Sequence, residues 1–206
     1  MEKKKFDACI DEHREKIAAI RKSAHDLHDS VNQKYGKDKP YGFHLDMAAR
    51  GFFEYGHLVL DREEDILPVC FGLWYHDSME DARLTYNDVR KTAKSLGLDE
   101  RQEELGAEIV YALTNEKGRN RKERANDKYY EGIRRTPYAP FAKLADRLAN
   151  LRYSFRMDDT PNRIMAKVYE AEFPDFIRAI QVDSEDPRYG LPEEMIEECR
   201  RVITEK

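Results

Sequence analysis

The sequence predicts an all-α fold built as one domain. Apolar residues recur at steps of three and four through most of the chain, which is typical of amphipathic helices. No stretch of useful length alternates apolar and polar residues as a half-buried strand does. The 206 residues suit a single hydrophobic core, and no repeat or low-complexity linker divides them.

The N-terminal segment predicts one long amphipathic helix. Its stripe consists of Phe6, Ile10, His13, Ile17, Ile20, Ala24, Leu27 and Val31. Gly36 is expected to end this helix as the residue after its C-cap, and Pro40 blocks any continuation.

Four further helices with recognisable ends follow. They are expected at about 44–55, 66–74, 86–96 and 100–113. Pro68 fits the first turn of the second of these helices, where Trp74 is expected in the core. Thr85 and Asp99 are good N-caps for the other two, and Gly97 separates them as a stop.

The C-terminal part predicts three more helices after a charged segment. Residues 116–135 are either loop or exposed helix. The helices are expected at 141–153, from Pro161 to about Val182, and from Pro192 to about Ile203. Pro174 should kink or split the second of them.

Composition narrows the function classes. The net charge of −5, from 36 basic and 41 acidic residues, argues against a nucleic-acid-binding surface but leaves room for a local basic pocket. Cys9, Cys70 and Cys199 are too far apart for a zinc motif or a disulfide framework, so we expect three buried thiols. No apolar run resembles a secretory signal or a membrane span, so we expect a cytoplasmic location.

Polar residues interrupt the apolar pattern at three places that together suggest a metal site. His44 lies in KPYGFHLDMAA, His76 and Asp77 lie in WYHDSMEDA, and Asp146 lies within the apolar stripe of FAKLADRLANLR. A buried carboxylate without a partner costs several kcal/mol, which a cation near Asp146 would offset. Two histidines and two aspartates suit Mn²⁺, Fe²⁺ or Zn²⁺.

Each of these residues also has a simpler interpretation when taken alone. His44 is compatible with a capping role near a turn, and Asp146 with pairing to a helix end or to Arg147, itself compatible with a surface position. Glu80 and Asp81 lie one turn beyond Asp77, where they would handle a water or merely form an acidic helix end.

The charged segment EKGRNRKERANDK has two interpretations as well. A run of basic residues is usually a solvated face. Beside an acidic metal site, its arginines and lysines would also suit the phosphate oxygens of an anionic substrate.

These motifs resemble those of the HD-domain metal-dependent phosphohydrolases, in the order H, HD, D. HDSMEDARLTYNDV is similar to the HD-x-x-ED-T motif of the hydrolase domain in RelA/SpoT homologues. KLADRLANLR resembles KLADRLHNMR of that family, and KPYGFHLDMA resembles its PYxxHP element. The resemblance covers about residues 20–155 and is closest to small alarmone hydrolases such as the metazoan SpoT homologues.

The resemblance implies a helical HD-domain bundle that uses Mn²⁺, or another divalent ion, to remove the 3′-pyrophosphate from (p)ppGpp. It implies four metal ligands, namely His44, His76, Asp77 and Asp146. It further implies that Glu80 and Asp81 activate or orient the attacking water, and that Lys34, Arg121 and Asn150 contact the nucleotide.

The chain departs from the family pattern at four positions near these motifs. Gln33 stands where the family has an arginine that stacks on the base. The other departures are Leu45, Ala82 and Ala149. An HD phosphohydrolase acting on another phosphorylated nucleotide or nucleotide cofactor is therefore the alternative.

A non-catalytic nucleotide-binding module is a third hypothesis, which the complete set of ligands disfavours. We expect residues 1–206 to form a single HD-type domain with a helical extension at 156–206, serving as a lid, a packing element or a dimer surface. The expected partner is a small-molecule nucleotide, without nucleic acid or membrane, and the oligomeric state and metal identity stay open.

Overall fold

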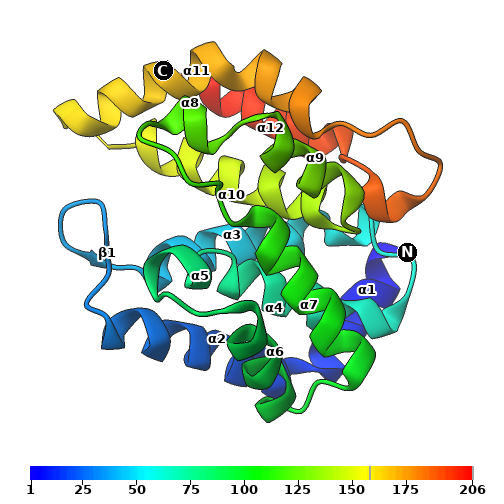
Figure 1. The fold of residues 1–206 in the computed structure, drawn as a ribbon. Helices are drawn as coiled ribbons and strands as arrows, with labels where there is room; N and C mark the ends of the chain where they lie inside the picture. The colour runs from blue at the N-terminus through cyan, green and yellow to red at the C-terminus, as the bar shows by residue number, and fades with distance from the viewer. Residues whose placement is uncertain (158, 206) are drawn as a thin grey trace.

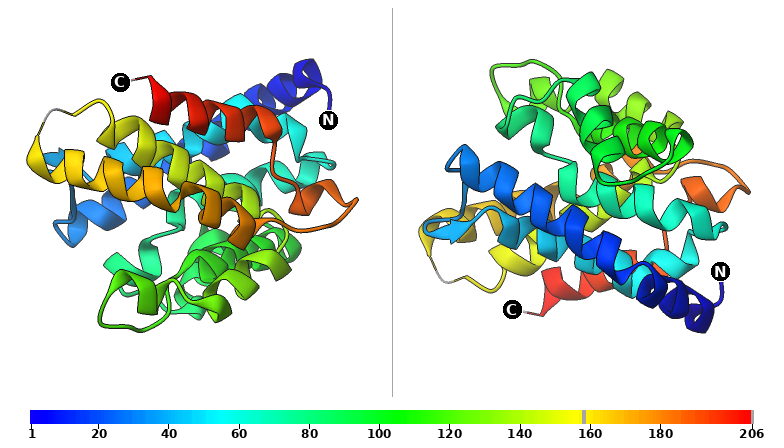
Figure 2. Two further views of the ribbon diagram at one scale, coloured as in Figure 1. Left: turned by 90° about the horizontal axis from the view of Figure 1, so that it is seen from above. Right: turned by 90° about the horizontal axis from the view of Figure 1, so that it is seen from below.

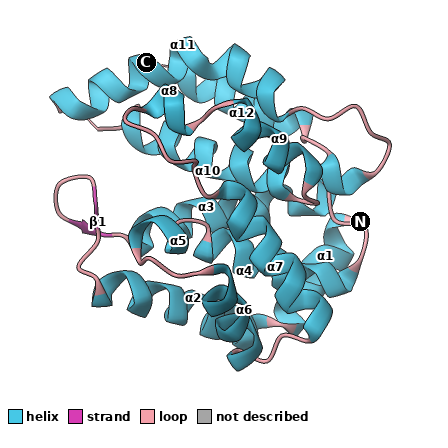
Figure 3. Ribbon diagram, in the orientation of Figure 1, coloured by secondary structure: helices cyan, strands magenta, loops and turns pink. Residues whose placement is uncertain are grey.

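The computed structural model describes residues 1–157 and 159–205, and the predicted all-α fold class is confirmed. Helices dominate Figure 3, with one small hairpin of strands. The α-helices are α1 (Lys3–Glu12), α2 (Arg14–Ser30), α3 (Gly42–Tyr55), α4 (Ile66–Tyr75), α5 (Ser78–Asp81), α6 (Tyr86–Ser95), α7 (Glu100–Leu113), α8 (Arg121–Arg124), α9 (Asp127–Arg135), α10 (Ala139–Ser154), α11 (Thr160–Ile180) and α12 (Glu193–Thr204). The short elements are η1 (Gly56–Leu58), η2 (Glu63–Asp65), η3 (Pro187–Tyr189), β1 (Lys34–Tyr35) and β2 (Lys39–Pro40).

Helix α4 is the centre of the bundle, because every one of its residues is buried. It packs against α2, α3 and α7, while α3 packs in turn on α10 (Figure 1). Helices α11 and α12 cover the far side of α10, as the left view of Figure 2 shows. Buried side chains from α1 to α12 form one continuous core.

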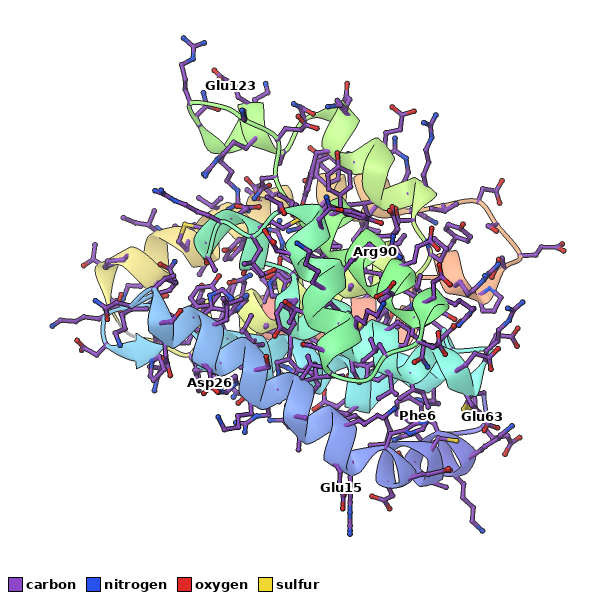
Figure 4. All side chains as sticks on the ribbon, turned by 60° about the horizontal axis from the view of Figure 1, so that its bottom comes forward. Phe6, Glu15, Asp26, Glu63, Arg90 and Glu123 are labelled. Carbon is purple, nitrogen blue, oxygen red and sulfur yellow. The ribbon has the colours of Figure 1, made fainter. Side chains whose placement is uncertain are left out.

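The outer helix α2 illustrates how the stripe divides core from solvent. Ile17, Ile20 and Ala24 are buried, whereas Glu15 and Asp26 are exposed on its outer side (Figure 4). Trp74 and the three cysteines are buried as expected. None of the helices in the described part of the chain combines the length and apolarity that crossing a bilayer requires.

The prediction of one long N-terminal helix is wrong at two points. The backbone leaves the helix at His13, between α1 and α2, although residues on both sides of the break are buried. Because the apolar stripe continues on both sides of His13, the sequence pattern gives no sign of the break. Helix α2 then ends at Ser30, because Asn32 adopts a positive φ of 54° and the Gln33 amide donates to the His28 carbonyl oxygen. This is a Schellman-type end with asparagine in the place expected for glycine.

Gly36 instead lies in the turn between β1 and β2, which the sequence pattern does not reveal. It has a φ of 61°, a conformation that glycine adopts without strain. The strands pair antiparallel, with Lys34 opposite Pro40 and Tyr35 opposite Lys39. Strands of two residues are too short to show an alternating pattern.

The other helix ends agree well with local sequence signals. Thr85 and Asp99 each form a capping box with the residue three positions later. The charged segment contains the short helix α8 and the amphipathic helix α9. Pro174, expected to kink or split the helix from Pro161, does not split it, because α11 runs unbroken through this residue, and the kink stays a prediction. The buried residues Tyr169, Phe173 and Phe176 lie on both sides of that proline and anchor the helix.

Arg147, for which the sequence left a surface position or a pairing with Asp146 open, is buried. Its guanidinium carbon lies 4.6 Å from the ring centre of Tyr169 and 4.3 Å from that of Phe176. Its Nη1 is 3.4 Å from Glu172 Oε2. Arg147 therefore faces α11 and does not pair with Asp146, although the two are neighbours in sequence.

His28 is a buried titratable group on α2. Within the described part of the chain, neither of its ring nitrogens has a hydrogen-bond partner. The ring stacks on Tyr41 with centroids 4.7 Å apart. Burial, which disfavours the charged imidazolium, lowers the pKa of His28 to about 4.

This pKa predicts a specific loss of stability in acid. In the unfolded chain His28 has a pKa near 6.5, so between about pH 6.5 and 4 the unfolded state binds more protons and stability falls as pH falls. A His28→Phe variant keeps the stack on Tyr41. Between pH 7.5 and 4.5, its free energy of unfolding, measured with urea, should fall by about 2 kcal/mol less than that of the wild type. The control Leu27→Ala should lose as much free energy of unfolding between pH 7.5 and 4.5 as the wild type does. Equal pH dependence in the wild type and His28→Phe would refute the prediction.

Candidate metal centre

Two helices and the junction between two others bring the four predicted ligands together. His44 lies in the first turn of α3, His76 follows the last residue of α4, Asp77 is the N-cap of α5, and Asp146 lies in the middle of α10. His44 and His76 are each only 2% exposed, and Asp146 is 9% exposed. Within the described residues, His44, His76 and Asp77 form a group whose potential ligand atoms all lie within 4.8 Å of one another.

The distances from the two imidazole Nε2 atoms to each other and to the two carboxylates suit coordination to one ion, and the tightest group consists of His44, His76 and Asp77. The two Nε2 atoms of His44 and His76 are 3.3 Å apart. Asp77 Oδ2 is 2.9 Å from His76 Nε2 and 3.6 Å from His44 Nε2. Asp146 Oδ1 is 3.3 Å from His44 Nε2 and 3.8 Å from His76 Nε2. Ligands bound at about 2.1 Å with an angle of about 100° between them lie about 3.2 Å apart, close to these spacings.

The orientation of His76 also fits a role as ligand. Its Nδ1 lies 2.7 Å from the carbonyl oxygen of Leu73, one turn earlier in α4. Since a carbonyl oxygen only accepts, Nδ1 carries the proton and donates it. Nε2 is thereby turned toward the other donors, as the second nitrogen of a metal-bound histidine usually is.

The centre concentrates negative charge in the interior. Burial opposes ionisation of Asp77 and Asp146, but the nearby cationic groups hold both carboxyl pKa values well below the ordinary value. Burial likewise opposes charging of His76, yet Asp77, Asp146 and the Leu73 carbonyl together raise the pKa of His76 to about 9. The carboxylates thus demand positive charge nearby, which a divalent cation supplies more fully than a proton does.

Two further side chains contact the ligands and were missed by the sequence reasoning. The Tyr41 hydroxyl donates a hydrogen bond to Asp77 Oδ2. The Lys143 ammonium lies 2.9 Å from Asp146 Oδ2 and is almost fully enclosed. Lys143 precedes Asp146 by three residues on α10, and this spacing, which places both on one helix face, was the available signal.

The two predicted water-handling acids lie in different surroundings. Burial and the neighbouring Asp77 carboxylate raise the pKa of Asp81 to about 6. Glu80 is exposed and accepts hydrogen bonds from the backbone amide of Asn115 at 2.6 Å and from its side-chain amide at 3.1 Å. Asp81 therefore adjoins the ligands, whereas Glu80 holds the segment that follows α7.

Asn150 is part of the centre through Asp146. Its Nδ2 donates to Asp146 Oδ1 at 2.6 Å, and its Oδ1 accepts from the Tyr35 hydroxyl at 2.9 Å. Its predicted contact with a nucleotide stays a prediction, because in this arrangement its amide is engaged within the protein.

The two predicted cationic contacts lie at the periphery. Lys34 is exposed on β1 of the hairpin, with the half-buried Gln33 before it. Arg121 on α8 forms an ion pair at 3.0 Å with Glu172 of α11, and its guanidinium carbon lies 5.2 Å from the ring centre of Tyr169. Their role in phosphate binding stays a prediction.

Comparisons with protein-family models and with curated proteins return no match for this chain.

The geometry predicts one divalent-ion site that depends on its donors. The wild-type protein should bind one Mn²⁺ per chain in calorimetric titration. His76→Ala and Asp77→Ala should each weaken binding by at least about 100-fold, since removing a group that only supports a ligand already costs 10–100-fold. His13→Ala, which alters the junction of α1 and α2 far along the chain, is the control and should bind as the wild type does. Wild-type affinity in Asp77→Ala would exclude this site.

Proposed function

We propose that the protein is a metal-dependent phosphohydrolase that removes the 3′-pyrophosphate of (p)ppGpp, giving GDP or GTP and pyrophosphate. The observation that carries this proposal is the convergence of groups from three separate motifs: two imidazole Nε2 atoms lie 3.3 Å apart, and a carboxylate oxygen of Asp77 and one of Asp146 each lie 2.9–3.8 Å from them. The order of those motifs along the chain, and their likeness to the RelA/SpoT hydrolase motifs, supports the choice of substrate.

His44, His76, Asp77 and Asp146 would hold the ion. A divalent cation there supplies Lewis-acid chemistry, which favours deprotonation of water and polarises a phosphoryl oxygen. Asp81 is the candidate proton acceptor, because its pKa of about 6 leaves it mostly ionised near neutrality and basic enough to take a proton. Glu80 would act through the loop that it holds at Asn115.

Positive charge near the centre suits a polyphosphate. The half-buried Lys143 ammonium lies beside Asp146, where desolvation opposes its charge but Asp146 keeps the pKa of Lys143 raised. It is the cation best placed to offset phosphoryl charge next to the donors. The exposed Lys34 and its neighbours Lys37 and Lys39 on the hairpin add cations farther out.

A second candidate is hydrolysis of a different phosphorylated nucleotide or nucleotide cofactor. Gln33 replaces the arginine that the resemblance assigns to base stacking, and Arg121 is already paired with Glu172. Two of the contacts expected for the alarmone are therefore missing or engaged elsewhere, whereas the four candidate metal ligands are all present. A binding module without catalysis is disfavoured, since it would need neither the four donors nor Asp81.

A panel of nucleotides tests the proposed reaction directly. With Mn²⁺ added, the protein should release pyrophosphate from ppGpp and pppGpp, and the nucleotide products should be GDP and GTP. Pyrophosphate and inorganic phosphate are to be measured separately against 3′-phosphorylated cofactors and nucleoside triphosphates. Unchanged ppGpp under excess metal, with turnover of another compound in the panel, would transfer the function to the second candidate.

A substitution at Asp81 tests the proposed proton acceptor. Asp81→Asn removes the basic oxygen but keeps its size, so kcat should fall by about 10²–10⁴-fold. Mn²⁺ binding should persist, because Asp81 is not one of the four donors. Asp88→Asn, in the capping box of α6, is the matched control and should keep wild-type kcat. A kcat for Asp81→Asn within a few-fold of the wild type would rule out this role.

A further inference from the structure

Tyr35 connects the β1–β2 hairpin to the metal centre by two separate contacts. Its ring stacks on the His44 imidazole, with centroids 4.7 Å apart and planes 19° apart. Its hydroxyl donates to Asn150 Oδ1 at 2.9 Å. One side chain from outside the helical bundle therefore contacts a ligand on α3 and the helix that carries a ligand on α10.

The stacking contact is significant because His44 lacks the support that His76 has. His76 Nδ1 donates to the Leu73 carbonyl, but His44 Nδ1 is buried without a hydrogen-bond partner among the described residues. On its Nδ1 side, the His44 ring is therefore held by packing rather than by a hydrogen bond. Tyr35 lies against its face, and Tyr41 meets it edge-on with centroids 5.5 Å apart.

The hydroxyl contact reaches Asp146 through a defined relay. Since the Asp146 carboxylate only accepts, Asn150 must turn its NH₂ group toward Asp146 and its oxygen toward Tyr35. Asn150 Nδ2 donates to Asp146 Oδ1 at 2.6 Å, and this same oxygen lies 3.3 Å from His44 Nε2. The Tyr35 hydroxyl thereby supports the orientation of the Asn150 amide that holds Asp146 Oδ1, while Lys143 holds Asp146 Oδ2.

The hairpin is seated so that Tyr35 stays in this position. In Figures 1 and 2 it lies at one edge of the bundle. A Cβ atom on Gly36 would lie only 2.1 Å from the Tyr153 hydroxyl, so the turn is pressed closely on α10. The ring centroids of Tyr35 and Tyr153 are 4.6 Å apart.

We propose that Tyr35 is a positioning residue of the metal centre, which orients His44 by stacking and Asp146 through Asn150. This inference rests on the metal site of the proposed function but not on the identity of the substrate. Groups that orient metal ligands commonly contribute 10–100-fold to metal affinity.

Mn²⁺ affinity measured by calorimetry without any substrate tests the proposal. Tyr35→Phe keeps the ring and removes the hydroxyl, so it should weaken Mn²⁺ binding by about tenfold. Tyr35→Ala also removes the stack on His44 and should weaken binding further. Tyr153→Phe removes a hydroxyl from the same aromatic group without touching the relay, and should bind within about twofold of the wild type.

A double-mutant cycle separates positioning from a general structural role. Once Asn150→Ala has broken the relay, adding Tyr35→Phe should change Mn²⁺ affinity less than twofold. Metal-free Tyr35→Phe should unfold at the wild-type urea concentration. Wild-type affinity in Tyr35→Phe, or full additivity with Asn150→Ala, would overturn the proposal for Tyr35 while leaving the metal site intact. Failure of the wild-type protein to bind Mn²⁺ would instead reject the metal site itself and the proposed function with it.

Discussion

The enclosure of two carboxylates, the half-buried Asp77 and the buried Asp146, is the constraint on which the surrounding structure depends. Placed in the interior without partners, each would cost several kcal/mol. The protein surrounds them with two imidazoles, the Lys143 ammonium, the Tyr41 hydroxyl and the Asn150 amide. These groups come from separate helices, so the charges are compensated only when α3, α4, α5 and α10 are assembled. The same arrangement that compensates the carboxylate charges also makes the centre suitable for a divalent ion.

Helix α10 serves both the centre and the C-terminal helices, because successive residues on a helix point about 100° apart. Asp146 faces the donors, whereas Arg147 is enclosed by Tyr169, Phe176 and Glu172 of α11. One turn therefore carries a candidate ligand and the main polar contact to the following helix. A shift of α11 at Arg147 would therefore also move Asp146, because the two residues are adjacent in the backbone of α10.

Helix ends were predictable where they depend on local chemistry, as at Thr85 and Asp99 with their capping boxes. The break at His13 was not, because burial continues on the same side of both helices. The four donors were recognisable as a set from their motifs, but their supports were not. The contact of Tyr35 with His44 depends on a strand of two residues, and the burial of Arg147 depends on a helix that begins thirteen positions later.

The C-terminal segment lies outside the resemblance to known hydrolases, yet it covers an otherwise bare face of α10. Arg152 near the end of α10 reaches Glu54 of α3 at 2.9 Å and Glu198 of α12 at 3.0 Å, so α12 helps to hold α3 against α10. A shortened chain ending near residue 155 would contain every donor of the centre but would expose apolar surface and the Arg147 guanidinium. It would be prone to aggregation, so the smallest unit able to fold is larger than the region that carries the motifs.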